Sequence, residues 1–409
     1  MIFYDSIPFT SLKNLSLNNK RVFLRADLNV PIQQKIILDD FRLQAIIPTL
    51  RYIQKHGGKV ILATHLGRPK TENPTLLEEK LSTEQLICWF EQNGFEIEFE
   101  KDLKRAQEKS KFHFSRILLL ENIRAFKQER EPSDLFATEL AQLADIYIND
   151  AFATIHRNDT SIALLPNHFA ANAKGIGFIV EDEMAILNQL SQEPKQPFLI
   201  ILGGNKVQDK LKVLVHFLSQ APELTPCTII LAGPMAYTVL KAQGIEIGRS
   251  LYEPQSIAQA ELLCTLAATT NTELILPIDH VIADNENEKG KVHREQAIPR
   301  KKAAFDIGPL SIQKFCEAIS KAKTIFANGP LGKYENPEFA KGTAIILRAI
   351  AYADAFKVIG GGDLIATLMQ QDLEHYFNFI STGGGATLEY LSHRNPENEL
   401  AGLKALLTK

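Results

Sequence analysis

Arginine or histidine follows each of the first four short apolar runs of the chain, which span residues 22–24, 60–63, 117–120 and 146–148. The polar residues after these runs are Arg25, Asp27 and Asn29, then His65, Gly67 and Arg68, then Asn122 and Arg124, and last His156 and Arg157. Guanidinium groups are planar, forked donors that suit phosphate and carboxylate groups. One such arginine alone would be read as a solvated surface charge, but the repetition over four runs favours a binding site for a small anion.

The apolar runs of the second half end instead in glycines and amides. The segments are GGNK (203–206), AGPM (232–235), NGPLG (328–332), GGGD (360–363) and STGGG (381–385). Glycine has no Cβ, so its backbone can approach a ligand closely, and successive N–H groups at the start of a helix bind phosphate oxygens. These segments therefore predict a phosphate-binding site.

Three charged residues belong to the glycine segments. Lys206 and Lys210 are four residues apart and would share one face of a helix that begins after GGNK. An exposed basic face is the alternative, but their place after paired glycines favours contact with phosphate. Asp363 follows three glycines and could bind a magnesium ion that bridges nucleotide phosphates, or it could be a helix N-cap.

A sheet whose strands end at one edge must position these residues. Six further apolar runs span 198–202, 228–231, 274–276, 324–326, 356–359 and 377–380. Stretches with helical periodicity lie between the runs, at 42–56, 82–93, 134–144, 209–220, 311–322 and 339–353. This alternation is typical of buried parallel strands joined by crossover helices. In such sheets ligands bind beyond the carboxyl ends of the strands.

Residues 167–197 contain no clear strand, although 181–193 are helix-like, and the segment closes with two prolines. We place the domain boundary in this region. The pattern therefore predicts an α/β protein with two units in tandem and a helical connector.

The composition narrows the function classes. The 409 residues are 45% hydrophobic and 23% charged, and the formal net charge is −3, so a nucleic-acid partner is not expected. The cysteines at 88, 227, 264 and 316 lack CxxC spacing, which predicts neither a zinc site nor a disulfide framework. No signal-peptide pattern and no apolar run of about 18 residues is found. We expect a cytoplasmic protein without a membrane partner.

Eight segments, in order, closely resemble phosphoglycerate kinases. They are KRVFLRADLNVP (20–31), HLGRP (65–69), LLLENIR (118–124), NDAFATIHR (149–157), LGGNKVQDK (202–210), MAYTVLKAQG (235–244), GGGD (360–363) and STGGGA (381–386). The resemblance implies two similar-sized Rossmann-like lobes with parallel sheets flanked by helices, joined by a helical hinge that closes. It implies an N-terminal phosphoglycerate-binding domain (1–172), a C-terminal nucleotide-binding domain (173–390), and a tail (about 391–409) packed back on the first.

The implied activity is reversible Mg²⁺-dependent phosphoryl transfer between ATP and 3-phosphoglycerate, giving ADP and 1,3-bisphosphoglycerate in glycolysis and gluconeogenesis, by a monomer. The substrate-binding residues implied by the resemblance are Arg25, Asp27, Asn29, Arg42, His65, Leu66, Gly67, Arg68, Arg124, His156 and Arg157. Those implied for the nucleotide are Gly204, Lys206, Lys210, Asn328, Glu335, Gly360, Gly361, Gly362 and Asp363. Arg42, Lys206 and Lys210 would be catalytic, Glu335 would hold the ribose, and Asp363 would bind the metal.

The chain departs from the family pattern at several positions. Asp159 replaces a histidine near the anion site, and Ala232, Pro234, Ala327, Leu364, Asn205 and Gln208 are changes on the nucleotide side. A catalytically weak regulatory protein that binds nucleotide and anion on the same fold is therefore kept as an alternative. A nicotinamide dehydrogenase is a remote alternative, because the glycine fingerprint of dinucleotide-binding proteins is missing. The P-loop of Walker A proteins is missing as well.

Overall fold

The computed structural model describes residues 7–70, 73–112, 117–220, 226 and 228–407, so Cys227 lies outside the described residues. The internal contacts divide the chain into two compact units, which we call the first lobe (1–185 and 395–409) and the second lobe (186–394). The division falls inside helix α6 (Phe178–Gln192). The boundary at 172/173 stays a prediction.

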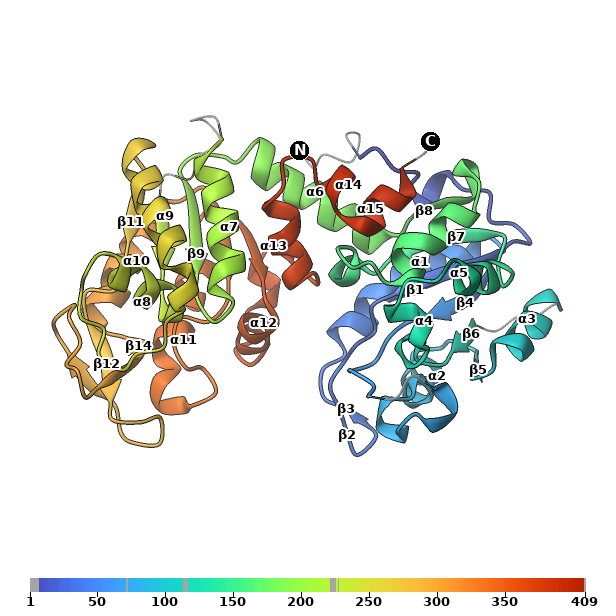
Figure 1. Ribbon diagram of the computed structural model, residues 1–409, viewed down its shortest axis with the longest axis horizontal. Helices are drawn as coiled ribbons and strands as arrows, with labels where there is room; N and C mark the ends of the chain where they lie inside the picture. The colour runs from blue at the N-terminus through green and yellow to red at the C-terminus, as the bar shows by residue number, and fades with distance from the viewer. Residues whose placement is uncertain (1–6, 71–72, 113–116, 221–225, 227, 408–409) are drawn as a thin grey trace. The chain divides into compact units, whose positions relative to one another are not determined.

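The first lobe is built on a six-stranded parallel sheet (Figure 1). In spatial order its strands are β5 (Ile97–Glu100), β6 (Ile117–Leu120), β4 (Lys59–Ala63), β1 (Arg21–Ala26), β7 (Ile146–Asp150) and β8 (Lys174–Ile176). The flanking helices include α1 (Phe41–Lys55), α2 (Ile87–Gln92), α3 (Leu103–Lys111), α4 (Lys127–Arg130) and α5 (Asp134–Ala141). A small hairpin is formed by β2 (Ile32–Gln33) and β3 (Ile36–Ile37). The carboxyl ends of β6, β4, β1 and β7 thus lie side by side.

Alternate residues of these strands form the core of the first lobe. One face of β1 and β4 supplies Val22, Leu24, Val60 and Leu62, all buried. They belong to the same apolar cluster as the buried face of α1, which comprises Leu43, Ile46, Leu50 and Ile53. Burying each such side chain stabilises the fold by about 1.5–3 kcal/mol relative to exposure, so the sheet edge that carries the polar residues is rigidly held.

The end of the described chain also belongs to the first lobe. Helices α14 (Pro396–Glu399) and α15 (Ala401–Leu406) form here. The N–H of Gly402 donates to the carbonyl of Ile155 at 2.8 Å, and Lys174 Nζ donates to the carbonyl of Ala405 at 3.0 Å. Gly402 has no room for a Cβ, which would lie 2.8 Å from the Ile155 carbonyl oxygen, so only glycine permits this close approach.

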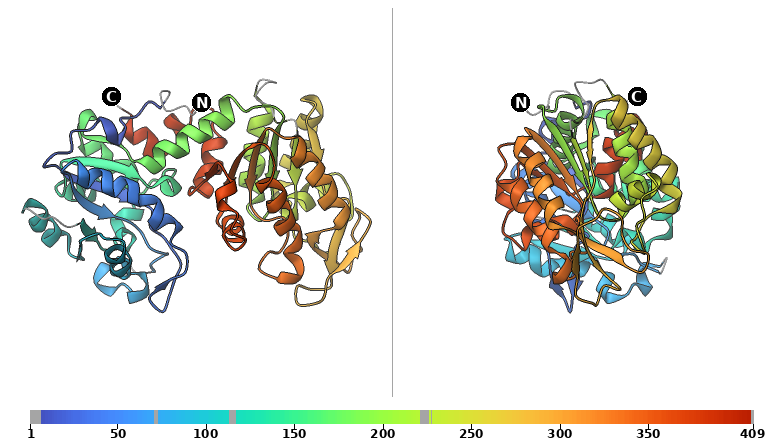
Figure 2. Two further views of the ribbon diagram at one scale, coloured as in Figure 1. Left: turned by 180° about the vertical axis from the view of Figure 1, so that it is seen from behind. Right: turned by 90° about the vertical axis from the view of Figure 1, so that its left-hand side faces the viewer.

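The second lobe holds another six-stranded parallel sheet. Its spatial order is β11 (Glu273–Ile275), β10 (Thr228–Leu231), β9 (Phe198–Leu202), β15 (Thr324–Asn328), β16 (Phe356–Gly360) and β17 (Phe379–Ile380). Helices α10 (Pro309–Lys321), α11 (Lys341–Ala351) and α12 (Gly362–Met369) share an apolar cluster with one face of the sheet. Helices α7 (Val207–Leu218), α8 (Gly233–Ala242), α9 (Ile257–Thr269) and α13 (Gly385–Leu391) form the other layer (Figure 2).

The α/β architecture predicted from the pattern is confirmed, and each of the ten apolar runs contains residues of a parallel strand. The prediction that 167–197 lacks a strand is wrong, because β8 adds to the sheet edge beside β7. This strand has only three residues, with Lys174 and Gly175 among them, too few for an apolar pattern. The sequence also missed β5 and an antiparallel sheet of β13 (Lys291–His293), β12 (His280–Ala283) and β14 (Ala303–Ile307).

Within the described part of the chain, no helix is both long and apolar enough to cross a bilayer.

Candidate functional site

The carboxyl edge of the first sheet gathers a polar cluster that we call the arginine site. Its members are Arg25, Asp27, Asn29, Arg42, His65, Arg124 and Arg157. They come from the ends of β1, β4, β6 and β7 and from the first turn of α1. His65 lies within electrostatic range of Asp27, Arg25, Arg124 and Arg157, which brings together residues up to 132 positions apart in the sequence.

Asp27 orients Arg42 in this site. Its Oδ2 accepts from Arg42 Nη1 at 2.6 Å, and its Oδ1 accepts from the N–H of Asn29 at 3.2 Å. Burial raises the pKa of the Asp27 carboxyl, but the nearby Arg42 guanidinium and other positive groups outweigh burial, so its pKa lies below the ordinary value. Asp27 therefore stays ionised and fixes the direction of the Arg42 guanidinium.

The backbone after β4 is fixed just as firmly. Asn29 Oδ1 accepts from the N–H of Gly67 at 2.8 Å, and Asn122 Nδ2 donates to the carbonyl of Leu66 at 2.6 Å. Gly67 has φ +60°, a left-handed conformation that favours glycine. The predicted residues Leu66 and Gly67 thus form a rigid turn at the edge of the site.

His65 is neutral in this environment. Its side chain is buried, and burial lowers its pKa to about 3 despite the Asp27 carboxylate, with three arginines adding to the decrease. At neutral pH the imidazole carries no charge, and its buried Nδ1 has no hydrogen-bond partner among the described residues.

Arg25 is fully buried, which sequence reasoning did not indicate. Its Nε donates to Ser161 Oγ at 2.8 Å, and Ser161 Oγ donates to Glu129 Oε1 at 2.6 Å. Burial raises the pKa of the Glu129 carboxyl to about 7. Through Ser161, Arg25 fixes the loop after β7, and its direct contact with a ligand stays a prediction.

Arg124 and Arg157 present N–H groups that the described part of the chain does not satisfy. Arg124 Nε and Arg157 Nη1 are buried without a hydrogen-bond partner. Burial lowers the pKa of Arg157, and the neighbouring Arg124 adds to the decrease. Buried donors without partners are rare and costly in native structures, so an anion that accepts from both would complete this site.

Asp159 competes for one of these arginines. Its Oδ2 lies 3.4 Å from Arg124 Nη2, and both side chains are largely buried. The predicted residues Arg68, which is exposed, and His156, which is half-buried, follow the same sheet edge. That either one contacts a ligand stays a prediction.

The carboxyl edge of the second sheet meets the N-termini of three helices. Helices α7, α8 and α12 begin after β9, β10 and β16, respectively. In the sheet β10 lies next to β9, and one strand, β15, separates β9 from β16. Gly204, Gly233 and Gly361 adopt positive φ in these turns. Gly203 cannot carry a Cβ either, because it would collide with the Pro330 carbonyl. Converging helix N-termini favour bound phosphate.

Lys210 lies beneath these turns. It is buried, and its Nζ donates to the carbonyls of Gly203 and, at 3.4 Å, Asn328. Burial lowers its pKa to about 8, and Lys206 adds to the decrease. Asn328 Nδ2 is buried without a partner among the described residues and faces Gly360. The alternative of an exposed basic face is therefore wrong for Lys210.

Lys206 and Asp363 stand at two helix starts. Lys206 is the N-cap of α7 with φ +62°, and its Nζ points toward Gly385, where a Cβ would lie 3.9 Å away. Asp363 lies within the first turn of α12, whose N-cap is Gly361, so the N-cap alternative for Asp363 is wrong. Asp363 Oδ1 accepts from Tyr334 Oη at 3.0 Å.

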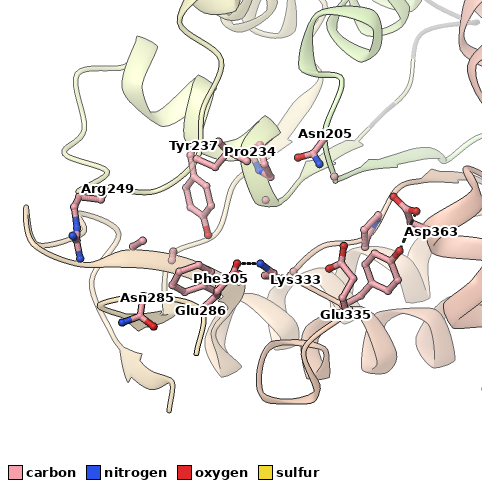
Figure 3. Close-up of a pocket in the computed structure, with 18 of the residues that line it drawn as sticks. Asn205, Pro234, Tyr237, Arg249, Asn285, Glu286, Phe305, Lys333, Glu335 and Asp363 are labelled. Atoms are coloured by element: carbon pink, nitrogen blue, oxygen red, sulfur yellow. Dashed lines mark hydrogen bonds and ion pairs between the residues drawn. The ribbon is translucent and has the colours of Figure 1, made fainter. Parts of the chain in front are cut away.

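A cavity of about 580 Å³ opens in front of these turns, and we call it the glycine pocket (Figure 3). Of the predicted residues, Gly204, Glu335 and Asp363 line it. Sequence reasoning missed other lining residues, which are Tyr237, Arg249, Leu251, Asp284, Asn285, Glu286, Phe305, Lys333 and Tyr334. Lys333 and Tyr334 adjoin Glu335 and could have been found. Residues 284–286 follow β12, and Phe305 lies within β14, so both belong to the region of the antiparallel sheet that the sequence did not predict.

Comparison with known proteins shows the family of the chain. The family model of phosphoglycerate kinase matches residues 12–394. The chain is 37% identical to a phosphoglycerate kinase of Bdellovibrio bacteriovorus over 98% of this chain and 97% of that protein. It is 38% identical to one of Koribacter versatilis, covering 98% and 99%. The solved structure of phosphoglycerate kinase from Coxiella burnetii superposes with a TM-score of 0.82 at 32% identity, covering 98% and 99%.

Proposed function

The chain belongs to the phosphoglycerate kinase family, and we propose that its arginine site holds 3-phosphoglycerate while its glycine pocket holds the nucleotide. Its reaction is the reversible transfer of a phosphoryl group between ATP and the carboxylate of 3-phosphoglycerate, a step of glycolysis. Relatives that match along nearly the full length of both chains support the enzyme and give no support to a catalytically weak regulator.

Arg25 Nη2 is also buried without a partner among the described residues, but the site assignment rests on two other unsatisfied donors, Arg124 Nε and Arg157 Nη1. A phosphate group offers several acceptor oxygens with negative charge and would satisfy both. Calorimetric titration with 3-phosphoglycerate tests the assignment: Arg157→Ala should weaken binding strongly. Unchanged binding would mean that the acid binds elsewhere.

The proposed mechanism rests on position and charge rather than on covalent chemistry. Phosphoryl transfer needs an in-line arrangement and neutralisation of the charge on the transferring group. Arg42, oriented by Asp27, would stabilise the reacting carboxylate and phosphoryl oxygens. Lys206, Lys210 and the helix N–H groups would do the same from the nucleotide side. In-line transfer requires the two ligands to meet, which we attribute to closure of the lobes.

The residues of the glycine pocket fit a magnesium ion. Asp363 offers an exposed carboxylate beside the turns that face the phosphates, and among the described residues no group of three or more His, Cys, Asp or Glu side chains forms a cage for a metal. Magnesium is commonly held in this way, by one or two carboxylates together with phosphate oxygens and water. When bound, the ion would neutralise charge between the phosphate groups, with Asp363 as its protein ligand.

Tyr334→Phe should raise the magnesium concentration needed for half-maximal activity about three- to tenfold, a modest form of the loss seen when a partner of a metal ligand is removed. The hydroxyl of Tyr334 orients Asp363, and phenylalanine cannot donate that hydrogen bond. The measurement is a magnesium titration at fixed ATP. An exposed tyrosine elsewhere in the second lobe, in the variant Tyr352→Phe, serves as the control and should leave the curve in place.

Asp159→Asn should lower KM for 3-phosphoglycerate about three- to tenfold, because it removes a like charge from an anion site and releases Arg124. Asp159→Glu keeps the charge and should show no such gain. The measurement is KM from initial rates at varied concentrations of 3-phosphoglycerate. An unchanged or higher KM in Asp159→Asn would show that the carboxylate does not oppose the substrate.

We further propose that the enzyme works as a cytoplasmic monomer and binds no nucleic acid. The near-balanced charge, 45 Lys and Arg against 48 Asp and Glu, supports the absence of a nucleic-acid partner. Sedimentation at assay concentrations tests the oligomeric state.

A further inference from the structure

Helix α7 begins on a residue with an unusual backbone conformation. Its N-cap, Lys206, has φ +62°, in the left-handed region that residues with a side chain rarely adopt. The Lys206 side chain makes no capping hydrogen bond. The hydrogen bond that closes the first turn, from the N–H of Lys210 to the carbonyl of Lys206, is 3.3 Å long. The start of α7 is therefore held only weakly by its own residues.

A carboxylate from a distant loop caps this turn instead. Glu253 Oε2 accepts from the N–H of Gln208 at 2.8 Å, across 45 positions of the sequence. Gln208 is the second residue of α7, where backbone N–H groups have no acceptor inside the helix. A negative charge at a helix N-terminus also interacts favourably with the helix dipole. Glu253 thus supplies the cap that the Lys206 side chain does not provide.

Glu253 is itself held by several hydrogen bonds. Its N–H donates to Oγ1 of Thr238, a fully buried residue of α8, at 3.1 Å. Its carboxylate also accepts from Ser256 Oγ at 3.1 Å and from Gln255 Nε2 at 2.8 Å. Because the loop is tied to α8 and the carboxylate is tied to α7, Glu253 fixes the start of α7 relative to α8.

The cap acts on the turn that directs the Lys206 ammonium. Lys206 Nζ lies near the start of α13, where a Cβ on Gly385 would be 3.9 Å away. The left-handed conformation of Lys206 sets the direction in which its side chain leaves the backbone. Such conformations persist only where the surrounding structure imposes them. The N–H that Glu253 holds is two residues from Lys206, so this hydrogen bond helps to impose the conformation.

We infer that Glu253 is a positioning residue for phosphoryl transfer, which keeps the Lys206 ammonium directed at the transferring group by capping α7. The inference rests on the proposed function, in which Lys206 neutralises charge on that group. Glu253 is not among the described residues that line the glycine pocket, so it acts through Lys206 and not on a ligand. Position matters here, because a misplacement of about 1 Å can lower a rate about 10²-fold.

Glu253→Ala should lower kcat about ten- to thirtyfold, less than the full cost of misplacement, because the Lys206 ammonium is still present. The KM for 3-phosphoglycerate, whose proposed site lies in the first lobe, should change by less than about twofold. Glu253→Gln keeps the shape and one acceptor oxygen, so it should recover much of the rate. The measurement is initial rates at varied 3-phosphoglycerate with saturating ATP and magnesium.

A double-mutant cycle separates positioning of Lys206 from general damage to the lobe. Lys206→Ala should lower kcat by itself, and adding Glu253→Ala should lower it by less than about a further twofold, because residues that act as a unit are not additive. A merely structural role of Glu253 would lower kcat by the same factor in both backgrounds. Gln208→Ala is the matched control, because it removes an exposed side chain and keeps the N–H that donates to Glu253. It should behave as the unaltered enzyme.

The outcomes distinguish the inference from the proposed function. Near-normal kcat of Lys206→Ala would refute the proposed role of this lysine, and the inference with it. A lowered kcat of Lys206→Ala together with a near-normal kcat of Glu253→Ala would overturn the inference alone, and so would additive losses in the double variant. Thermal midpoints show whether each variant folds. If Glu253→Ala does not fold, the milder Glu253→Gln completes the same cycle.

Discussion

Replacing Lys210 by alanine is expected to lower kcat about 10²–10³-fold, the scale for losing one charge-stabilising donor at a transition state. Lys210 Nζ is buried against the carbonyls of Gly203 and Asn328, behind the turn that we propose faces the nucleotide phosphates. Few waters could replace a buried ammonium there. The measurement is the steady-state rate with saturating ATP, magnesium and 3-phosphoglycerate.

The same lysine predicts a pH dependence. Burial lowers the pKa of Lys210 to about 8, so the charged form dominates below that pH and is lost above it. The kcat/KM of the enzyme for nucleotide should therefore decline as the pH rises through about 8, since this ratio reports the free enzyme. Bound phosphate stabilises the ammonium, so the decline in kcat should come at higher pH.

Lys212→Ala is the matched control, because Lys212 is exposed on the same helix, α7. It should keep both kcat and the pH profile. Near-normal turnover of Lys210→Ala would show that Lys210 is not a catalytic residue. If kcat/KM for nucleotide stays constant from pH 8 to 9, the charge of Lys210 does not contribute to the nucleotide step.

Replacing Arg42 by alanine is expected to reduce kcat by a similar factor, about 10²–10³. The guanidinium of Arg42 is held at 2.6 Å by Asp27, and the Arg42 side chain is 29% exposed, so the side chain is anchored and still accessible to a ligand. Its loss also leaves the buried Asp27 carboxylate without its main counter-charge, which raises the pKa of Asp27 from its lowered value. The lost positive charge and the uncompensated Asp27 carboxylate both disfavour binding of an anionic substrate.

Arg42→Lys separates the effect of charge from that of geometry, since lysine keeps the positive charge but lacks the forked N–H donors of a guanidinium group. It should recover only part of the lost rate. Arg51→Ala, at an exposed position of the same helix α1, should behave as the unaltered enzyme. Thermal midpoints of the variants check that the fold is kept. Full activity of Arg42→Ala in a folded protein would exclude the role proposed for Arg42.

The nucleotide side illustrates how far local sequence signals reach. Glycines at positive φ, such as Gly204 and Gly361, and the apolar runs before them are dictated by neighbours a few residues away. Strand, turn and helix start were therefore predictable there. Lys333 and Glu286, which form an ion pair in the glycine pocket, are 47 positions apart, and no local pattern relates them. Their pairing depends on where an antiparallel sheet of short, partly exposed strands packs.

The anion side shows the same division. The sequence alone determined that arginines follow the ends of parallel strands, because the pattern of the apolar runs and the rule for carboxyl edges place them there. Only the tertiary structure decided that Arg25 is buried on Ser161, that Asp27 orients Arg42, and that Asp159 draws on Arg124. Burial and pairing of charge are set by atoms brought together from distant parts of the chain, so a single sequence carries no local record of them.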